Sequence, residues 1–139
     1  MYFKIDNGRV INSREPIEGG FEKEGLKYEC DSGRLVAVGD NDVRDKTDAE
    51  ILEDRRDMIE SSFFSSAEYQ VAKSLSPYAY ALTLQKASEG DEAALENLAW
   101  VEAIWDDHDG RVASLESPYD YDIDFSSHGD KPRQVREYA

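Results

Sequence analysis

The stretch from Asp91 to Leu115 reads DEAALENLAWVEAIWDDHDGRVASL and is the longest uninterrupted helical pattern in the sequence. Its apolar residues and one histidine follow one another at alternating steps of four and three residues, the spacing that lines one seam of an α-helix. The seam consists of Ala94, Leu98, Val101, Trp105, His108, Val112 and Leu115. A second apolar line consists of Leu95, Trp100 and Ile104. The pattern predicts a long helix with neighbours on two sides, in which Gly110 permits a bend or break.

The residues before this stretch predict further helices. Thr47 and Glu50 have the spacing of a capping box, so a helix is expected to begin there and to run to about Ser61. The serine-rich stretch 61–66 is expected to interrupt it. A separate short helix should follow and end before Pro77, because the residue that precedes a proline avoids the α region.

Another helix is expected to begin at Pro77, which suits a first helical turn, and to stop at Gly90. Asp91 can then cap the long helix. Because the connection 88–90 is short, the two helices should fold into an antiparallel pair. The sequence therefore predicts a helical hairpin or bundle.

The N-terminal part has the signals of β-hairpins. Asn7-Gly8 lies between two short apolar runs and favours a type I′ turn, since both residues tolerate a positive φ. A second hairpin is predicted from residues 26–30 and 34–38, and the polar stretch 39–46 is then the connection to the helices. Cys30 falls on one of these predicted strands and is interpreted as a small packing residue.

Beyond Pro118 the chain alternates aromatic or apolar residues with acidic ones, from Tyr119 to Phe125. A period of two predicts an extended segment with one face docked and the other in water. The fold class is therefore α+β, with a β-hairpin region at 1–46, a helical region at 47–117 and an extended tail at 118–139. A chain of 139 residues is expected to fold as one compact unit.

The net charge is −15, from 31 acidic and 16 basic residues. Such a charge repels nucleic acids and anionic membranes, so neither is expected as a partner. The N-terminus has no apolar run of signal-peptide length, and no segment approaches the roughly 18 apolar residues that span a bilayer. Cys30 is the only cysteine, which excludes an internal disulfide. The expected location is the cytoplasm.

Two clusters have residue types used in catalysis. The stretch Asp106–Asp109 contains His108, but adjacent helical residues point about 100° apart and do not converge on one ion. The His is therefore interpreted as a packing residue. Ser126, His128 and Asp130 have the residue types of a hydrolase triad, yet they crowd on one predicted loop without a nucleophile elbow. The expectation is a protein that is not an enzyme and that binds neither a metal nor a cofactor.

The C-terminal half resembles a known group of proteins. The residues that carry the likeness are Ala99-Trp100-Val101-Glu102-Ala103-Ile104-Trp105, Arg111, Asp124-Phe125-Ser126-Ser127-His128-Gly129, Pro132 and Glu137. They resemble the C-terminal part of small tail-associated proteins of Mu-like prophages, which include tail-fibre assembly proteins and tail assembly chaperones. The resemblance implies a non-enzymatic role in the host cytoplasm, or on the virion, with a phage tail or fibre protein as the partner.

Two hypotheses of function follow. In the first, large aromatic and apolar side chains bind the tail or fibre protein. These candidate contact residues are Trp100, Ile104, Trp105, Tyr119, Tyr121 and Phe125. The alternative is that they form the core, and the seam 94–115 offers a further alternative, self-association into a homo-oligomer. In the second hypothesis the acidic protein mimics DNA and inhibits a DNA-binding enzyme, because most of the excess of acids lies after Thr47.

Overall fold

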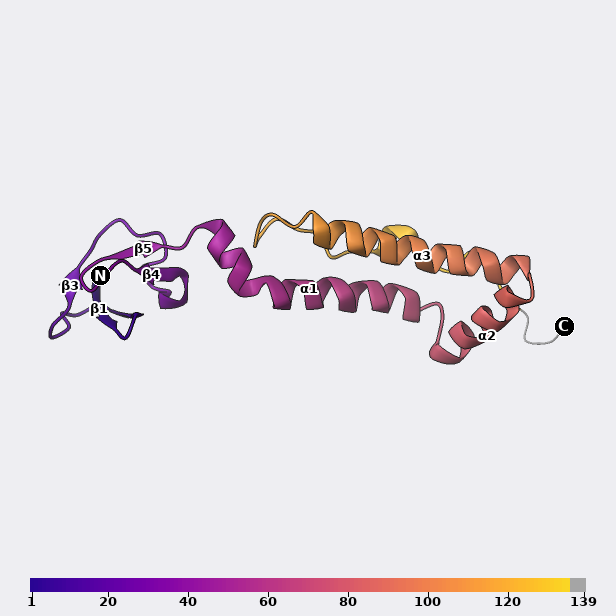
Figure 1. Cartoon of the computed structure of the whole chain (residues 1–139), viewed down its shortest axis with the longest axis horizontal. Helices are drawn as coiled ribbons and strands as arrows, with labels where there is room; N and C mark the ends of the chain where they lie inside the picture. The colour runs from indigo at the N-terminus through magenta and orange to yellow at the C-terminus, as the bar shows by residue number, and fades with distance from the viewer. Residues whose placement is uncertain (136–139) are drawn as a thin grey trace. The chain divides into compact units, whose positions relative to one another are not determined.

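The computed structural model describes residues 1–135, so that Glu137 lies outside the described residues. The chain divides into two compact units, and the boundary falls between Asp54 and Arg55, inside the first helix. The N-terminal unit holds the strands, and the C-terminal unit holds the helical pair and the tail (Figure 1). The predicted α+β class is confirmed. Within residues 1–135 no helix combines the length and apolarity that crossing a membrane requires.

The N-terminal unit opens with the hairpin that Asn7-Gly8 predicted. Strand β1 (Tyr2–Asp6) pairs antiparallel with β2 (Arg9–Ser13) along its whole length. Asn7 and Gly8 have φ angles of 51° and 77°, and two successive positive values are what a type I′ turn requires. Strand β3 (Phe21–Glu22) pairs with the other edge of β1, which gives the sheet order β2-β1-β3.

The second hairpin lies further along the chain than predicted. Strand β4 (Leu35–Ala37) pairs with β5 (Val43–Asp45), and β5 forms from residues that the sequence assigned to a connection. The strand predicted at 26–30 is wrong, because residues 27–30 form a turn. The Asp45 carboxylate accepts hydrogen bonds of 2.9 Å from two main-chain N–H groups of this stretch, those of Lys27 and Tyr28. These donors are therefore satisfied without a neighbouring strand.

The core of the N-terminal unit is small. Phe3, Leu35 and Val43, from three different strands, form one cluster of buried side chains. Gly20 lies so close to β1 that a Cβ atom there would be 2.5 Å from the Phe3 carbonyl oxygen, so this contact excludes any larger residue. Cys30 is exposed, and its interpretation as a packing residue was wrong.

Helix α1 (Asp48–Ala72) begins at the predicted capping box. The Glu50 N–H donates to Thr47 Oγ1 at 3.2 Å, and the Thr47 N–H donates to Glu50 Oε1 at 3.0 Å. The helix then runs through residues 61–66, where an interruption was predicted, and that prediction was wrong. Burial explains the difference, because Phe63 is only 1% exposed and lies on the inner face of a helix that continues past it.

Helices α2 (Pro77–Ser88) and α3 (Glu92–Ala113) pack against each other, as predicted. Gly90 lies between them with a φ angle of 85°, and the Asp91 side chain caps α3 by accepting a hydrogen bond from the main chain. Helix α3 continues through Gly110 without a break. Gly110 therefore adopts an ordinary helical conformation, and the predicted bend or break does not occur there.

The buried face of α3 is rotated relative to the predicted seam. Asn97 and Ile104 are 0% exposed, whereas Leu95 of the second apolar line is 48% exposed. The seam residues Ala94, Val101 and Leu115 are buried as predicted. A polar residue thus occupies the centre of the buried face, and its partner is a segment that follows α3 in the chain.

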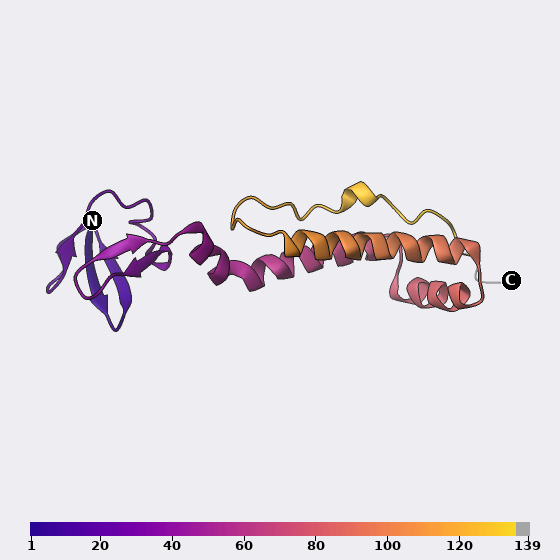
Figure 2. The same ribbon diagram turned by 45° about the horizontal axis from the view of Figure 1, so that its top comes forward.

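After α3 the chain reverses, and residues 118–135 return beside that helix (Figures 1 and 2). We call residues 118–135 the tail. It is extended apart from bends and one short 3-10 turn, η2 (Ser126–His128). The predicted alternation sets its burial only in part, since Phe125 is 2% exposed but Tyr119 and Ile123 are 46% and 36% exposed.

Candidate functional site

Side chains of α3 bind the main chain of the tail. The Trp100 indole Nε1 donates to the His128 carbonyl oxygen at 3.0 Å. The Asn97 amide makes two hydrogen bonds to one residue: its Nδ2 donates to the Arg133 carbonyl at 2.8 Å, and its Oδ1 accepts from the Arg133 N–H at 3.0 Å. Such contacts recognise a peptide backbone and not a particular side chain.

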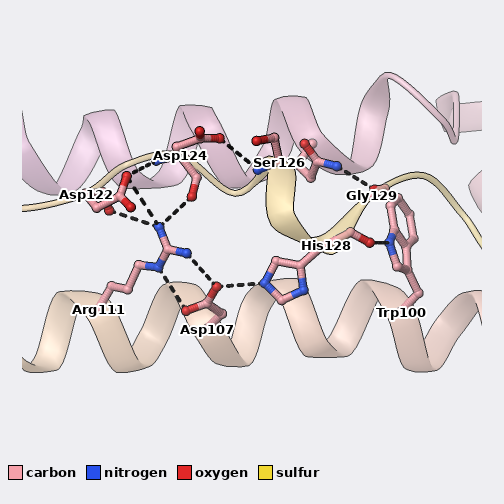
Figure 3. A network of polar contacts seen from close by, with 9 residues as sticks. Trp100, Asp107, Arg111, Asp122, Asp124, Ser126, His128 and Gly129 are labelled. Atoms are coloured by element: carbon pink, nitrogen blue, oxygen red, sulfur yellow. Dashed lines mark hydrogen bonds and ion pairs between the residues drawn. The ribbon is translucent and has the colours of Figure 1, made fainter.

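Arg111 makes the densest set of contacts, and Figure 3 shows it between α3 and the tail. Its Nη1 donates to the carbonyl oxygens of Asp122 and Asp124 at 3.0 and 2.7 Å. Its Nε and Nη2 both donate to the Asp107 carboxylate at 2.9 Å, in the bidentate geometry that a guanidinium favours. The guanidinium carbon also lies 4.1 Å from the centre of the Phe125 ring, which is a cation–π contact.

Asp107 joins Arg111 to His128. One carboxylate oxygen lies 2.7 Å from His128 Nε2, so the same group holds a residue of its own helix and a residue of the tail (Figure 3). The hydrogen bond from Arg111, followed by that from His128, lowers the pKa of the Asp107 carboxyl below its ordinary value of 3.8. Asp107 is therefore ionised at neutral pH.

Helix α1 and the turn that follows it bind the other side of the tail. Gln70, which is only 3% exposed, donates its Nε2 to the Gly129 carbonyl. Ser74 Oγ donates to the Asp130 carboxylate at 3.0 Å. The tail therefore lies between α1 and α3, as Figure 3 shows. We call this set of side chains, namely Gln70, Asn97, Trp100, Asp107 and Arg111, the tail clamp.

Apolar side chains anchor the tail at its two ends and near its centre. Pro118 and Phe125 are almost fully buried. Val135 is 7% exposed and packs with Ala93 and Ala94 at the start of α3. The residues between these anchors are mostly exposed. The binding of the tail to the helices therefore depends on only a few of its side chains.

The structure places three of the six candidate contact residues on α3. Ile104 is fully buried, and Trp100 is half-buried with its indole N–H turned to the tail. Trp105 is half-buried and packs against Phe64 of α1, with ring centres 5.2 Å apart. These three side chains therefore contact the rest of their own unit.

The other three candidates lie on the tail. Phe125 is buried, and Tyr121 packs on Phe63 with ring centres 5.7 Å apart. Tyr119 is 46% exposed, the largest exposure of the six. Of the seam of α3 that suggested self-association, Ala94 packs with Val135 of the tail, and Trp105 and His108 pack against Phe64 of α1.

The cluster Asp106–Asp109 and the cluster of Ser126, His128 and Asp130 are joined by one contact that the sequence did not predict. His108 packs against Trp105 and Phe64, as the packing interpretation predicted. Its neighbour Asp107 points to His128 of the second cluster instead. The i,i+4 spacing of Asp107 and Arg111 was the one signal in the sequence that could have indicated this network.

A different surface carries three of the exposed apolar side chains. Met58 and Tyr69 on α1 are 54% and 69% exposed, and Ile123 of the tail lies beside them. Two adjoining depressions run along this surface and share Ser65, Ser66 and Ile123. We call it the α1 face, and its residues are Met58, Ser61, Ser62, Ser65, Ser66, Tyr69 and Ile123.

The clamp and the α1 face both have the chemistry of peptide binding: hydrogen-bond donors directed at carbonyl groups, and apolar side chains beside small ones. Among residues 1–135 there is no group of three or more His, Cys, Asp or Glu side chains placed to hold a metal ion. The chain was also compared with known proteins. No protein-family model, no curated protein and no solved structure matches it.

Proposed function

We propose that this protein is a non-enzymatic interaction protein that acts in the assembly of a phage tail or tail fibre. It would shield an aggregation-prone tail or fibre subunit until that subunit is assembled. The role is suggested by the resemblance of residues 99–137 to small tail-associated proteins of Mu-like prophages. It would be carried out in the cytoplasm of the host cell, and the protein would reach the virion only if it stays bound to its partner.

The observation that carries the proposal is the α1 face. Met58 and Tyr69 are more than half exposed, and they lie on one side of a single helix. Large apolar side chains that gather on one surface mark an interaction site more often than scattered ones do. The serines between them are small, so a partner segment can approach the α1 backbone closely.

The surroundings of this face suit a shielding protein. The chain carries a net charge of −15, which keeps a complex soluble while the apolar side chains cover a partner. Lys73, at one end of the face, offers a positive charge, and Asp122 and Asp124 border it on the tail side. An apolar partner segment with a few polar residues fits this arrangement.

The experiment is co-purification of this chain with the tail or fibre subunit encoded beside it in its genome. The double variant Met58→Ser and Tyr69→Ser should lower the recovered subunit at least about fivefold, because truncated central aromatic and apolar anchors weaken interfaces most. Tyr78→Ser with Leu84→Ser is the matched control, since these α2 residues are 69% and 45% exposed outside the face. Equal losses in both double variants, or no recovery with the unaltered chain, would contradict the proposal.

The second candidate function is DNA mimicry, which is favoured by a row of carboxylates on α3. These exposed residues lie on the side of the helix away from Asn97 and Ile104, and they are Glu92, Glu102, Asp106 and Asp109. A protein that uses them would bind a basic DNA-binding enzyme strongly at low salt and weakly at high salt. Reversal of three of these charges to lysine should abolish inhibition, and the lack of any inhibition at low salt would exclude this candidate.

A further inference from the structure

We infer that the tail clamp is a binding site for an extended peptide segment of a partner, and that the chain's own tail occupies this site in cis. The ligand is an acidic, extended segment with a phenylalanine anchor, like residues 122–135. The inference rests on the proposed function only in naming the partner as an assembly subunit. Its site adjoins the α1 face through Gln70 and Ile123, but Met58 and Tyr69 are not clamp residues, so variants of each site test the two proposals separately.

The first step of the argument is what the clamp recognises. Trp100, Gln70 and Asn97 all donate to carbonyl oxygens of the tail, and Arg111 donates to two more. The carbonyls of Asp122 and Asp124 lie before the η2 turn, whereas those of His128 and Gly129 lie at its end, where Gly129 has a φ angle of 66°. A competing segment of different sequence must therefore reproduce this turn to present the same carbonyl groups. Main-chain contacts of this kind supply affinity in known peptide-binding sites, while a few pockets supply the specificity.

The second step is that one helix positions four of the five clamp side chains. Asn97, Trp100 and Arg111 all stand on one continuous helix, α3. Asp107 lies one turn before Arg111 and holds its guanidinium with two hydrogen bonds of 2.9 Å. The donor that binds two tail carbonyls is therefore positioned by its own helix, and a preorganised site binds a ligand at a smaller entropic cost.

The third step is that the tail is a replaceable occupant. Between Pro118 and Val135 only Phe125 is buried, and most other side chains point to water. The segment has little secondary structure of its own apart from η2, so its order comes from the clamp and from the buried anchors Pro118, Phe125 and Val135. A partner segment that fills the Phe125 position and offers its carbonyls can therefore compete with the tail.

The charges define the ligand further. Arg111 Nη1 lies 4.0 Å from the Asp122 carboxylate, and Lys73 Nζ lies 4.0 Å from that of Asp130. Acidic residues in these places of a partner segment would find the same cations. The net charge of −15 opposes the approach of an acidic segment, so these two cations must offset that repulsion locally.

The experiment measures binding of a fluorescent synthetic peptide of residues 118–135 to the full-length chain by anisotropy. Phe125→Ala in the chain weakens the tail in cis and leaves the clamp intact, so it should raise the affinity for the peptide at least about fivefold over the unaltered chain. Val135→Ser is the second variant of this kind and should act in the same direction. Asn97→Ala added to either variant should reverse the gain, because it removes a clamp residue. Circular dichroism identifies the variants that keep their helices.

Two further binding measurements distinguish the clamp from the α1 face as the site of peptide binding. A peptide in which Phe125 is replaced by alanine should bind at least about fivefold more weakly, and the chain with Met58→Ser and Tyr69→Ser should bind the unaltered peptide normally. The inference is overturned if no helical tail variant binds the peptide more tightly than the unaltered chain, or if Asn97→Ala leaves binding unchanged. In that case the tail is a fixed part of the fold, and the α1 face remains to be tested by co-purification.

Discussion

Asn97 on α3 pairs in both directions with the main chain of Arg133, with hydrogen bonds of 2.8 and 3.0 Å across 36 residues of sequence. The Asn97 side chain is 0% exposed, so no water replaces either bond. An amide in the middle of an otherwise apolar helix face thus fixes the register of the tail against α3.

Replacement of Asn97 by alanine should therefore destabilise the C-terminal unit. It removes both hydrogen bonds of a fully buried side chain and leaves the N–H and C=O of Arg133 without these partners, so we expect a loss of about 1–3 kcal/mol in the free energy of unfolding. Urea unfolding followed by circular dichroism measures this loss. Glu102→Ala, an exposed position on the same helix, is the control and should change stability by less than about 0.5 kcal/mol. Equal effects of the two substitutions would contradict the role given to Asn97.

Arg111→Lys tests whether the guanidinium is needed or only its charge. A lysine has one nitrogen and cannot bond the Asp107 carboxylate and two tail carbonyls together, so we expect a loss of about 1.5–3 kcal/mol in the free energy of unfolding. Hydrogen exchange of the amides of residues 122–128 should also become faster. Arg133→Lys is the control, because that side chain is half exposed and forms only a surface ion pair. Unchanged exchange in Arg111→Lys would show that charge alone is sufficient.

Gly110 and Gly20 should respond to alanine in opposite ways. Gly110 lies inside α3 with no atom within 4 Å of a Cβ, so Gly110→Ala should stabilise the protein by about 0.5–1 kcal/mol through helix propensity. A Cβ at Gly20 would meet the carbonyl oxygens of Phe3 and Ile17 at 2.5 and 3.0 Å. Gly20→Ala should therefore lower the thermal midpoint. Stabilisation by both substitutions would contradict the close contact at β1.

The capping box of α1 should make stability depend on pH in the acid range. The hydrogen bond from Arg44, followed by that from the Thr47 N–H, lowers the pKa of Glu50 from its ordinary 4.5 to about 2. A carboxyl group with a lower pKa in the folded state stabilises the fold fully above pH 4.5, and this contribution is lost as the pH falls towards 2. In Glu50→Gln the fall in urea midpoint between these pH values should be smaller. An identical fall in both proteins would contradict the assignment.

Local chemistry explains which parts of the fold could be predicted. The Asn7-Gly8 turn, the Thr47 capping box and the Gly90 stop all depend on a few adjacent residues, and each is confirmed. The helix interruption at 61–66 was wrong because Phe63 is buried, and tertiary burial outweighs a weak local preference. The strand at 26–30 was wrong because Asp45, some 17 residues away, satisfies its main-chain donors.

The clamp could not be predicted for a related reason. Its contacts join α1 and α3 to the main chain of a tail that is 11 to 59 residues away in sequence, from the pair of Arg111 with Asp122 to that of Gln70 with Gly129. Every residue has a main-chain carbonyl, so the identity of a residue does not reveal whether its carbonyl accepts a hydrogen bond. The aromatic residues were noticed for their size, but their size did not reveal that Trp100 acts through its N–H.

The main-chain contacts of the tail have a consequence for how it tolerates change. Substitutions at most exposed tail positions leave the carbonyls of Asp122, Asp124, His128 and Gly129 in place. Removal or insertion of a single residue between Phe125 and Arg133 would instead shift every later carbonyl away from its donor. The tail is therefore specified by its length more strictly than by its composition.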